Sequence, residues 1–249
     1  MNKLTFLGTA SAVPDEDQQN THFIIETKSR NILVDCVGNP VVRLKQAGVD
    51  PLSISDLVVT HFHPDHVSGV PLLLMDLWLM GRETPLYLYG LNEVLDRIEK
   101  MMSLFDWESW LGFYPVNFVR SQGKTQTNII DTDNVKVWTA PVSHMIPAIG
   151  LRIATPKCVL CYSSDTAPCD AVIELAHDAD ILIHEATGEG QGHSSPEQAG
   201  QIAQQAGVRK LYLIHYPVDA EVNDWVNRAK TCFSGGVVAA RDLMTIEFS

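Results

Sequence analysis

The chain has 249 residues, of which 45% are hydrophobic and 19% charged, and these proportions are typical of a globular rather than a disordered protein. Its 30 acidic and 18 basic residues give a formal net charge of −12. Extended binding of nucleic acid relies on clustered Lys and Arg, so this balance argues against tight, extended nucleic-acid binding. We expect one domain that spans residues 1–249.

No apolar run reaches the roughly 18 residues that a membrane span needs, and the first residues lead directly into a strand-like pattern. We therefore expect a cytoplasmic protein without a membrane segment. The five cysteines are odd in number and scattered, which favours reduced, buried thiols. Cys158 and Cys161 have the spacing of a redox or zinc motif, but in a strand such positions point to opposite faces, so we interpret them as structural.

Short apolar runs alternate along the chain with longer stretches of helical periodicity. The predicted strands are Leu4–Leu7, His22–Glu26, Asn31–Asp35, Asp56–Thr60, Leu86–Tyr89, Val135–Thr139, Ile149–Ile153, Cys158–Ser163, Asp180–His184, Lys210–Ile214 and Met244–Phe248. The predicted helices are Pro40–Ala47, Val67–Met80, Asn92–Phe105, Cys169–Ala176, Pro196–Ala206 and Glu221–Ala229. This order predicts a layered α/β fold with strands inside and helices outside.

The helix at 196–206 has the clearest start. Ser195 is a capping residue, Pro196 stands at the first helical position, and Gln198 completes a capping box.

Residues 61–66, with the sequence His-Phe-His-Pro-Asp-His, place four metal-binding side chains in six positions just after a predicted strand. In an extended chain His61 and His63 point to the same side and can share a metal. Asp65 and His66 follow the proline and turn toward a neighbouring position. One loop can therefore supply ligands to two adjacent ions, which is not expected of unrelated polar residues in a surface loop.

Two coordination spheres need further ligands, because catalytic zinc takes about three protein ligands and a water. Loops at one end of a sheet can converge on a single site, so residues at the ends of other predicted strands are candidates. They are His144, Asp165, His184, His193 and His215. Each of these histidines taken alone is more often structural, and only the loop at 61–66 makes the set credible.

The loop has the HxHxDH form of the metallo-β-lactamase superfamily, and six further segments resemble the ribonuclease Z branch of that superfamily in the same order. These are FLGTASAVP at 6–14, HMIPAIG at 144–150, YSSDT at 162–166, IHEAT at 183–187, GHSS at 192–195 and IH at 214–215. The resemblance covers nearly the whole chain. It implies a four-layer αββα sandwich with a dinuclear metal site at one edge.

The resemblance also implies seven metal ligands: His61, His63 and His144 on a first ion, Asp65, His66 and His215 on a second, and Asp165 between the two. Nitrogen and oxygen donors of this kind suit two zinc ions, with manganese or iron as alternatives. His184 is expected to be structural or to support a neighbouring residue, because the resemblance does not make it a ligand.

A hydroxide that bridges two such ions can attack a phosphodiester, while the ions stabilise the entering and leaving oxygens. The resemblance implies that Asp65 orients this nucleophile. It further implies that His193, supported by Glu185, protonates the leaving alkoxide, a task that suits a histidine of near-neutral pKa. An alternative for Glu185 is a buried acceptor that only holds a histidine in place.

The chain departs from ribonuclease Z between His66 and His144, where it has no glycine- and proline-rich basic insert like the arm with which that family clamps tRNA. The segment instead contains an acidic amphipathic helix at 92–105, which we expect to pack on the core, a lid or a second subunit. The aromatic residues that follow either pack in the ordinary way or line a substrate entrance or dimer contact. They are Trp107, Trp110, Phe113 and Tyr114.

Three smaller departures accompany the missing arm. Ser164 replaces a glycine of the family, Leu151 replaces a tyrosine, and the loop at 186–192 is short. Together they leave the metal ligands intact but put a tRNA substrate in doubt.

We therefore predict a dinuclear metal-dependent hydrolase, first of all a phosphodiesterase that acts on a small phosphodiester or an RNA 3′ end. The alternatives are a tRNA 3′-processing endoribonuclease without the arm, and a hydrolase of esters, lactones, thioesters or sulfates on the same fold. A non-catalytic metal-binding protein is the alternative from a different class. From the family and the apolar side of the helix at 92–105 we expect a homodimer.

Overall fold

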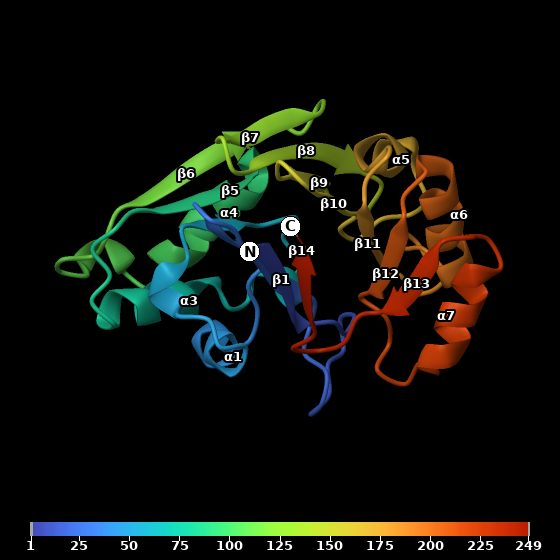
Figure 1. Cartoon of the computed structure of the whole chain (residues 1–249). Coiled ribbons are helices and arrows are strands. Elements are labelled where there is room, and N and C mark those ends of the chain that lie inside the picture. Colours follow the sequence, from blue (N-terminus) through green and yellow to red (C-terminus); the bar gives the residue numbers. More distant parts are fainter. Residues whose placement is uncertain (1, 249) are drawn as a thin grey trace.

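The computed structural model of the chain describes residues 2–248, in which two seven-stranded mixed sheets lie face to face with helices on their outer faces (Figure 1). The first sheet has the order β14-β1-β2-β3-β4-β5-β6, with β1 (Asn2–Gly8), β2 (His22–Glu26), β3 (Asn31–Val34), β4 (Asp56–Val58), β5 (Leu86–Leu91), β6 (Val116–Ser121) and β14 (Thr245–Phe248). The second has the order β13-β12-β11-β10-β9-β8-β7, with β7 (Thr127–Asp131), β8 (Lys136–Val142), β9 (Ala148–Ala154), β10 (Val159–Tyr162), β11 (Ile181–Glu185), β12 (Lys210–Ile214) and β13 (Gly236–Ala239).

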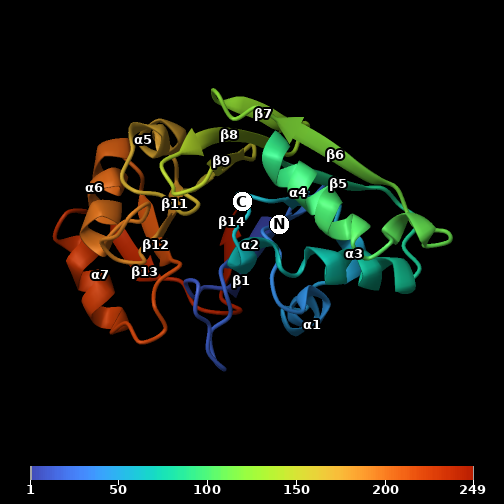
Figure 2. The same cartoon turned by 180° about the vertical axis from the view of Figure 1, so that it is seen from behind.

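Helices from the first half of the chain accompany the first sheet, and the later helices cover the second sheet (Figures 1 and 2). The first group is α1 (Pro40–Gln46), α2 (Pro64–Val67), α3 (Val70–Leu79) and α4 (Asn92–Ser103), with the short 3₁₀ helices η1 (Pro51–Ser53) and η2 (Trp107–Ser109). The second group is α5 (Asp170–Ala176), α6 (Pro196–Ala206) and α7 (Val222–Lys230). No helix within residues 2–248 has the length and apolar character needed to cross a membrane.

Alternation along the strands builds two apolar layers in the second half of the chain. In β12, Tyr212 and Ile214 belong to the main core, whereas Leu211 and Leu213 pack with residues of α5, α6 and α7. Phe6 of the first sheet lies 5.9 Å from Tyr212, measured between ring centroids, so the two sheets are in direct contact. Burial of each such large side chain contributes about 1.5–3 kcal/mol, and the sandwich is therefore a stable frame for the loops at its edge.

The predicted four-layer αββα fold is confirmed, and the helix predicted at 67–80 is found as α3, which begins at Val70 rather than Val67. The structure has two helices there, α2 and α3, separated at Ser68 and Gly69. The backbone of Gly69 passes so close to Val37 that a Cβ would lie 2.8 Å from the Val37 carbonyl carbon, and the Gly69 N–H donates to the carbonyl of Cys36. This contact fixes α2, the helix that carries two of the predicted ligands.

Three strands were not predicted: β6, β7 and β13. All three are edge strands of their sheets, and β6 and β7 have only one buried residue each. The helix predicted to reach Phe105 ends at Ser103.

The start of α6 agrees with the sequence pattern. The Ser195 hydroxyl accepts a hydrogen bond from the Gln198 N–H, and the Gln198 side chain accepts one from the Ser195 N–H. Near this start, Gly200 packs so tightly on α7 that a Cβ would lie 2.4 Å from the carbonyl oxygen of Ala229. The position of α6 therefore depends on the absence of a side chain at residue 200.

Replacing Gly200 with alanine is expected to lower the free energy of unfolding by about 1–3 kcal/mol, because α6 must move away from α7. Gln205→Ala is the matched control, since it adds the same residue to an exposed part of the same helix and removes no packing contact. Urea denaturation followed by circular dichroism measures both. Equal stability of Gly200→Ala and wild type would contradict this account, because alanine is intrinsically the better helix former.

Candidate metal centre

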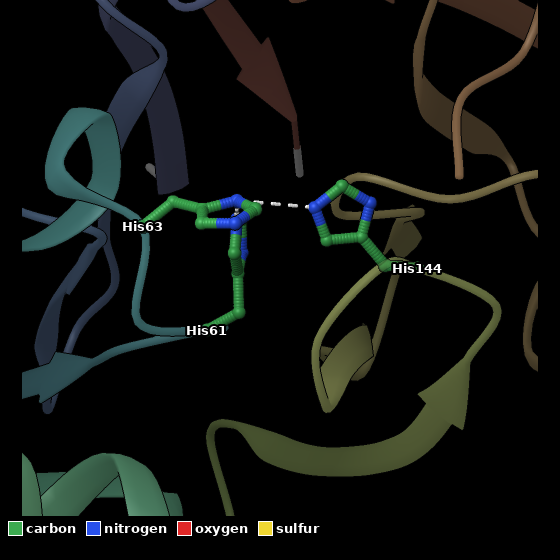
Figure 3. Close-up of side chains that lie close together, drawn as sticks. All are labelled: His61, His63 and His144. Carbon is green, nitrogen blue, oxygen red and sulfur yellow. Dashed lines mark hydrogen bonds between the residues drawn. The ribbon is translucent and has the colours of Figure 1, made fainter. Parts of the chain in front are cut away.

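The loop after β4 and the loop after β8 together bring three imidazole rings close to one another. The Nε2 atom of His61 lies 3.1 Å from Nδ1 of His63, which in turn lies 3.2 Å from Nε2 of His144. Figure 3 shows the three rings converging, two from one loop and the third from the opposite side. All three candidate ligand atoms lie within 4.8 Å of one another.

A second group adjoins the first and is centred on Asp165, which follows β10. One oxygen of its carboxylate, Oδ2, lies 3.5 Å from Nε2 of His66, 3.4 Å from Nε2 of His215 and 3.8 Å from Nε2 of His61. Asp65 adds another carboxylate, 3.5 Å from the same atom of His215. Asp165 therefore lies between the two groups, with contacts to members of both.

The distances between these side-chain atoms suit ligands of a shared metal ion better than direct hydrogen bonds between the side chains. Two ligands at about 2.1 Å from a tetrahedral ion are about 3.4 Å apart, which is the spacing observed here. Within residues 2–248, three of the buried candidate ligand atoms have no hydrogen-bond partner, namely Nε2 of His66, Nε2 of His215 and Oδ1 of Asp165. Such atoms are costly to bury unless a ligand or ion satisfies them.

An outer layer of hydrogen bonds orients the ligands, and Asp35 is its main member. One of its carboxylate oxygens, Oδ2, lies 2.8 Å from Nδ1 of His66, and the other accepts from the N–H of Thr60 at 2.8 Å. The Thr60 hydroxyl in turn lies 3.0 Å from Nδ1 of His61. The Asp35 carboxylate thus orients His66 directly and His61 through Thr60, so that Nε2 of both rings faces the centre.

Two other histidines are oriented in the same way. Nδ1 of His215 lies 2.8 Å from the hydroxyl of Thr187, and Nδ1 of His144 donates to the carbonyl of Gly192 at 2.8 Å. The short loop between β11 and α6 therefore fixes ligand candidates from both groups. Gly192 has φ +77° and its Cβ would come within 3.0 Å of His144, so a side chain at residue 192 would disturb this contact.

The pKa values of the histidines differ between the two groups. Burial, followed by the neighbouring histidines, lowers the pKa of His61 well below its ordinary value, and burial also lowers the pKa values of His63 and His144. These three rings are therefore neutral at pH 7, as metal binding requires. Burial opposes a charge on His66 too, but Asp165 and Asp35 raise its pKa well above the usual range, so this position attracts positive charge.

Glu185, at the end of β11, forms a pair with His193. The Oε1 atom of Glu185 lies 3.2 Å from Nδ1 of His193 and also accepts from the backbone N–H of Ser194. The other oxygen accepts from the N–H of Thr187. His193 lies within 4.8 Å of the ligand atoms of His144 and Asp165, which places its ring beside the centre.

The structure brings together all seven residues predicted as ligands, and it places Glu185 and His193 against them. Their roles stay predictions. His184 belongs to none of these groups, and its Nδ1 donates to the carbonyl of Glu185 at 2.7 Å. Sequence reasoning missed Asp35, Thr60 and Thr187; the only available signal was that Asp35 ends a strand beside the one that leads to the histidine loop.

Ser164, which the resemblance marks as a replacement of glycine, has φ +57°. Glycine adopts such a conformation without strain, whereas serine does so at some cost. The backbone beside Asp165 therefore has the shape that favours glycine, even though this chain carries a serine.

Fold and site define a class: a metallo-β-lactamase-fold hydrolase with a cluster of histidine and aspartate side chains suited to two metal ions. A family model described as the beta-lactamase superfamily domain matches residues 30–216. The chain thus belongs to the metallo-β-lactamase superfamily.

Its curated relatives include ribonuclease Z proteins, to which it is distantly homologous over almost its full length. Ribonuclease Z of Methanothermobacter thermautotrophicus is 28% identical, with 99% of this chain and 97% of that protein covered. Ribonuclease Z of Methanosarcina mazei is 25% identical, with 99% and 98% covered.

Solved structures show the same fold. The metallo-beta-lactamase fold protein YhfI from Bacillus subtilis matches with a TM-score of 0.85 at 21% identity, covering 98% of each chain. Human tRNase Z, short form, matches with a TM-score of 0.81 at 23% identity, covering 99% of each chain.

Replacing Asp35 with asparagine is expected to weaken metal binding about 10- to 100-fold, because the orienting carboxylate is lost while its shape is kept. Asparagine tolerates the left-handed backbone of residue 35, where φ is +58°, so the chain should still fold. Competition with a chelating dye measures the affinity for zinc.

The matched control is Asp56→Asn. Asp56 is also a buried aspartate, but it pairs with Arg30 and Tyr89 and is in no candidate metal group. Its replacement should lower stability and leave metal affinity unchanged. Equal zinc affinity of Asp35→Asn and wild type would show that Asp35 does not position the ligands.

Proposed function

We propose that the protein is a dinuclear metal-dependent phosphodiesterase. The observation that carries the proposal is the convergence of seven nitrogen and oxygen donors in two adjoining groups that meet at Asp165, with the Glu185–His193 pair beside them. The ribonuclease Z relatives, whose name denotes action on RNA, support a phosphodiester as the reacting group.

The donor set suits zinc at both positions, with His61, His63 and His144 for one ion and Asp65, His66 and His215 for the other. When bound, two such ions polarise a phosphodiester and lower the pKa of water, so that a nucleophile forms near neutral pH. The protein contributes the orientation of the ligands through Asp35, Thr60 and Thr187.

Asp65 and His193 are the proposed proton-handling residues. The side chain of Asp65 is 15% exposed, so its carboxylate can reach an attacking water at the edge of the centre. Glu185 holds Nδ1 of His193, which leaves Nε2 to donate a proton to the leaving oxygen. Burial lowers the affinity of His193 for a proton, but its hydrogen bond to Glu185 and the charge of that residue raise the pKa above the ordinary value, which favours the protonated ring.

The substrate we propose is a small phosphodiester. Processing of tRNA 3′ ends is the second candidate, and the relatives' names favour it. A net charge of −12 opposes extended contacts with RNA, and the segment between His66 and His144 contains α3, α4 and four strands, β5 to β8, without a basic arm. We further propose that residues 1–249 act as one domain and that the protein is a homodimer.

Wild-type protein is expected to bind about two zinc ions per chain and to hydrolyse bis(p-nitrophenyl) phosphate. Asp65→Ala should lose most of that activity and bind less metal, because one ligand of the second group is removed. Metal content by mass spectrometry and release of p-nitrophenol measure the two effects, with Asp76→Ala on α3 as the control.

Three other results would redirect the proposal. Two bound ions with ester or lactone hydrolysis but no diester hydrolysis would favour another reaction on the same site. Two bound ions with no hydrolysis of any substrate class would favour a non-catalytic metal-binding protein. A folded protein that binds no metal would falsify the central proposal.

His193→Ala should reduce hydrolysis of substrates with alkoxide leaving groups far more than hydrolysis of p-nitrophenyl esters, because p-nitrophenolate leaves without protonation. Glu185→Gln removes the charge that raises the pKa of His193. Activity on alkoxide-leaving substrates falls as pH rises through the pKa of the donor, so this alkaline limb should move to lower pH in Glu185→Gln. Full pH profiles of kcat on both substrate types test this; an unmoved limb would assign the proton to another group.

A further inference from the structure

A small hollow lies beside the candidate metal centre, between the segments that carry its first three histidines. It has a volume of about 50 Å³ and is lined by Phe62, Ile146, Pro147 and three residues of α4, Glu93, Val94 and Arg97. Phe62 stands between His61 and His63 in the sequence, and Ile146 follows His144 by two residues.

The hollow continues into a larger one along the start of α4. The second hollow has a volume of about 330 Å³, shares Glu93 and Pro147 with the first, and extends to Gln122 and Gly123 after β6. The two hollows are therefore candidates for binding the part of a substrate that does not react.

Arg97 contacts an aromatic ring and has no carboxylate partner among residues 2–248. Its guanidinium lies 5.5 Å from the centroid of the Phe62 ring, over the ring. Two acidic residues of the same helix, Asp96 and Glu99, pair instead with Arg120, and within residues 2–248 no carboxylate pairs with Arg97. Its guanidinium thus packs on an aromatic face and keeps hydrogen-bond donors for an anion from solution, although Glu93 lines the same hollow.

The surroundings make this charge more significant. The segments that carry the candidate ligands, at 60–69, 143–150, 163–168 and 183–195, contain no Lys or Arg. Arg97 lines a hollow together with Phe62 and Ile146, which are sequence neighbours of candidate ligands. A planar guanidinium with free donors recognises phosphate or carboxylate through paired hydrogen bonds.

We propose that Arg97, held on Phe62, binds a second anionic group on the non-reacting part of the substrate. This inference rests on the proposed phosphodiesterase function and narrows its substrate class to diesters that carry a further phosphate or carboxylate. The phosphate could belong to a small molecule as a terminal monoester or to a neighbouring residue of a nucleotide chain. Both share the chemistry that Arg97 recognises.

A pair of substrates that differ in one phosphate tests the proposal: the p-nitrophenyl ester of thymidine 5′-phosphate, with and without a 3′-phosphate. Wild type is expected to prefer the 3′-phosphorylated ester by roughly 10-fold or more in kcat/KM, the size of a charge-assisted hydrogen-bonded pair. In Arg97→Gln the ratio should fall close to one, and Arg97→Lys should restore part of it. Lys157→Gln, which removes a charge in the turn after β9, is the matched control and should keep the wild-type ratio.

A methyl ester on the 3′-phosphate distinguishes the two sources. Preference lost on methylation indicates a terminal monoester, and preference kept indicates a phosphate within a chain. The same wild-type ratio in Arg97→Gln would overturn the proposal, as would a wild type without any preference.

Binding provides a readout that does not need turnover. Calorimetry with the zinc-loaded protein compares thymidine 3′,5′-bisphosphate with thymidine 5′-phosphate, and Arg97→Gln should remove the tighter binding of the bisphosphate. If no diester is hydrolysed, the proposed function fails, while this comparison still decides whether Arg97 binds the second anion. If diesters are hydrolysed without a preference that depends on Arg97, only the present inference fails.

Discussion

The carboxylate of Asp165 is 2% exposed and lies within 3.8 Å of ring nitrogens of three histidines. Burial alone would raise its pKa, but the histidines His215, His66 and His61 hold the pKa well below the usual range, so the group stays charged. A buried charge costs several kcal/mol unless it is compensated. A cation held between Asp165 and these histidines would compensate that charge.

This constraint explains why the ligands come from the ends of strands. Strands β3 and β4 run parallel in the first sheet, and β10, β11 and β12 run parallel in the second. The segments leaving their C-terminal ends carry Asp35, the histidine loop, Asp165, Glu185 and His215. The rigid sheets fix where each segment starts, and the outer hydrogen bonds of Asp35, Thr60 and Thr187 fix how each ring is turned. Asp35 and His215 have left-handed backbone conformations, which the surrounding structure must stabilise.

The sequence allowed the fold class and the members of the site to be predicted, but not the supporting contacts. Four candidate ligands occur in six positions and the motifs follow a known order, so both signals are local and can be read without a structure. Edge strands such as β6 and β7 bury less apolar surface, and the alternation of apolar and polar residues along them is correspondingly weak. The break at Gly69 and the pairing of Asp35 with His66 arise from contacts between segments about 30 residues apart, which no local pattern encodes.

Charge around the centre restricts what the site can bind. A polyanion gains affinity from several phosphate contacts at once, and each contact needs a nearby cation. The loop at 11–20, which pairs with Tyr216 next to His215, carries Asp15, Glu16 and Asp17 and no basic residue. Acidic residues in this loop disfavour a long polyanion nearby, whereas α4 carries the guanidinium of Arg97 over Phe62. Under the function we propose, this charge distribution suits a compact substrate with its charge concentrated near the scissile group better than a long polyanion.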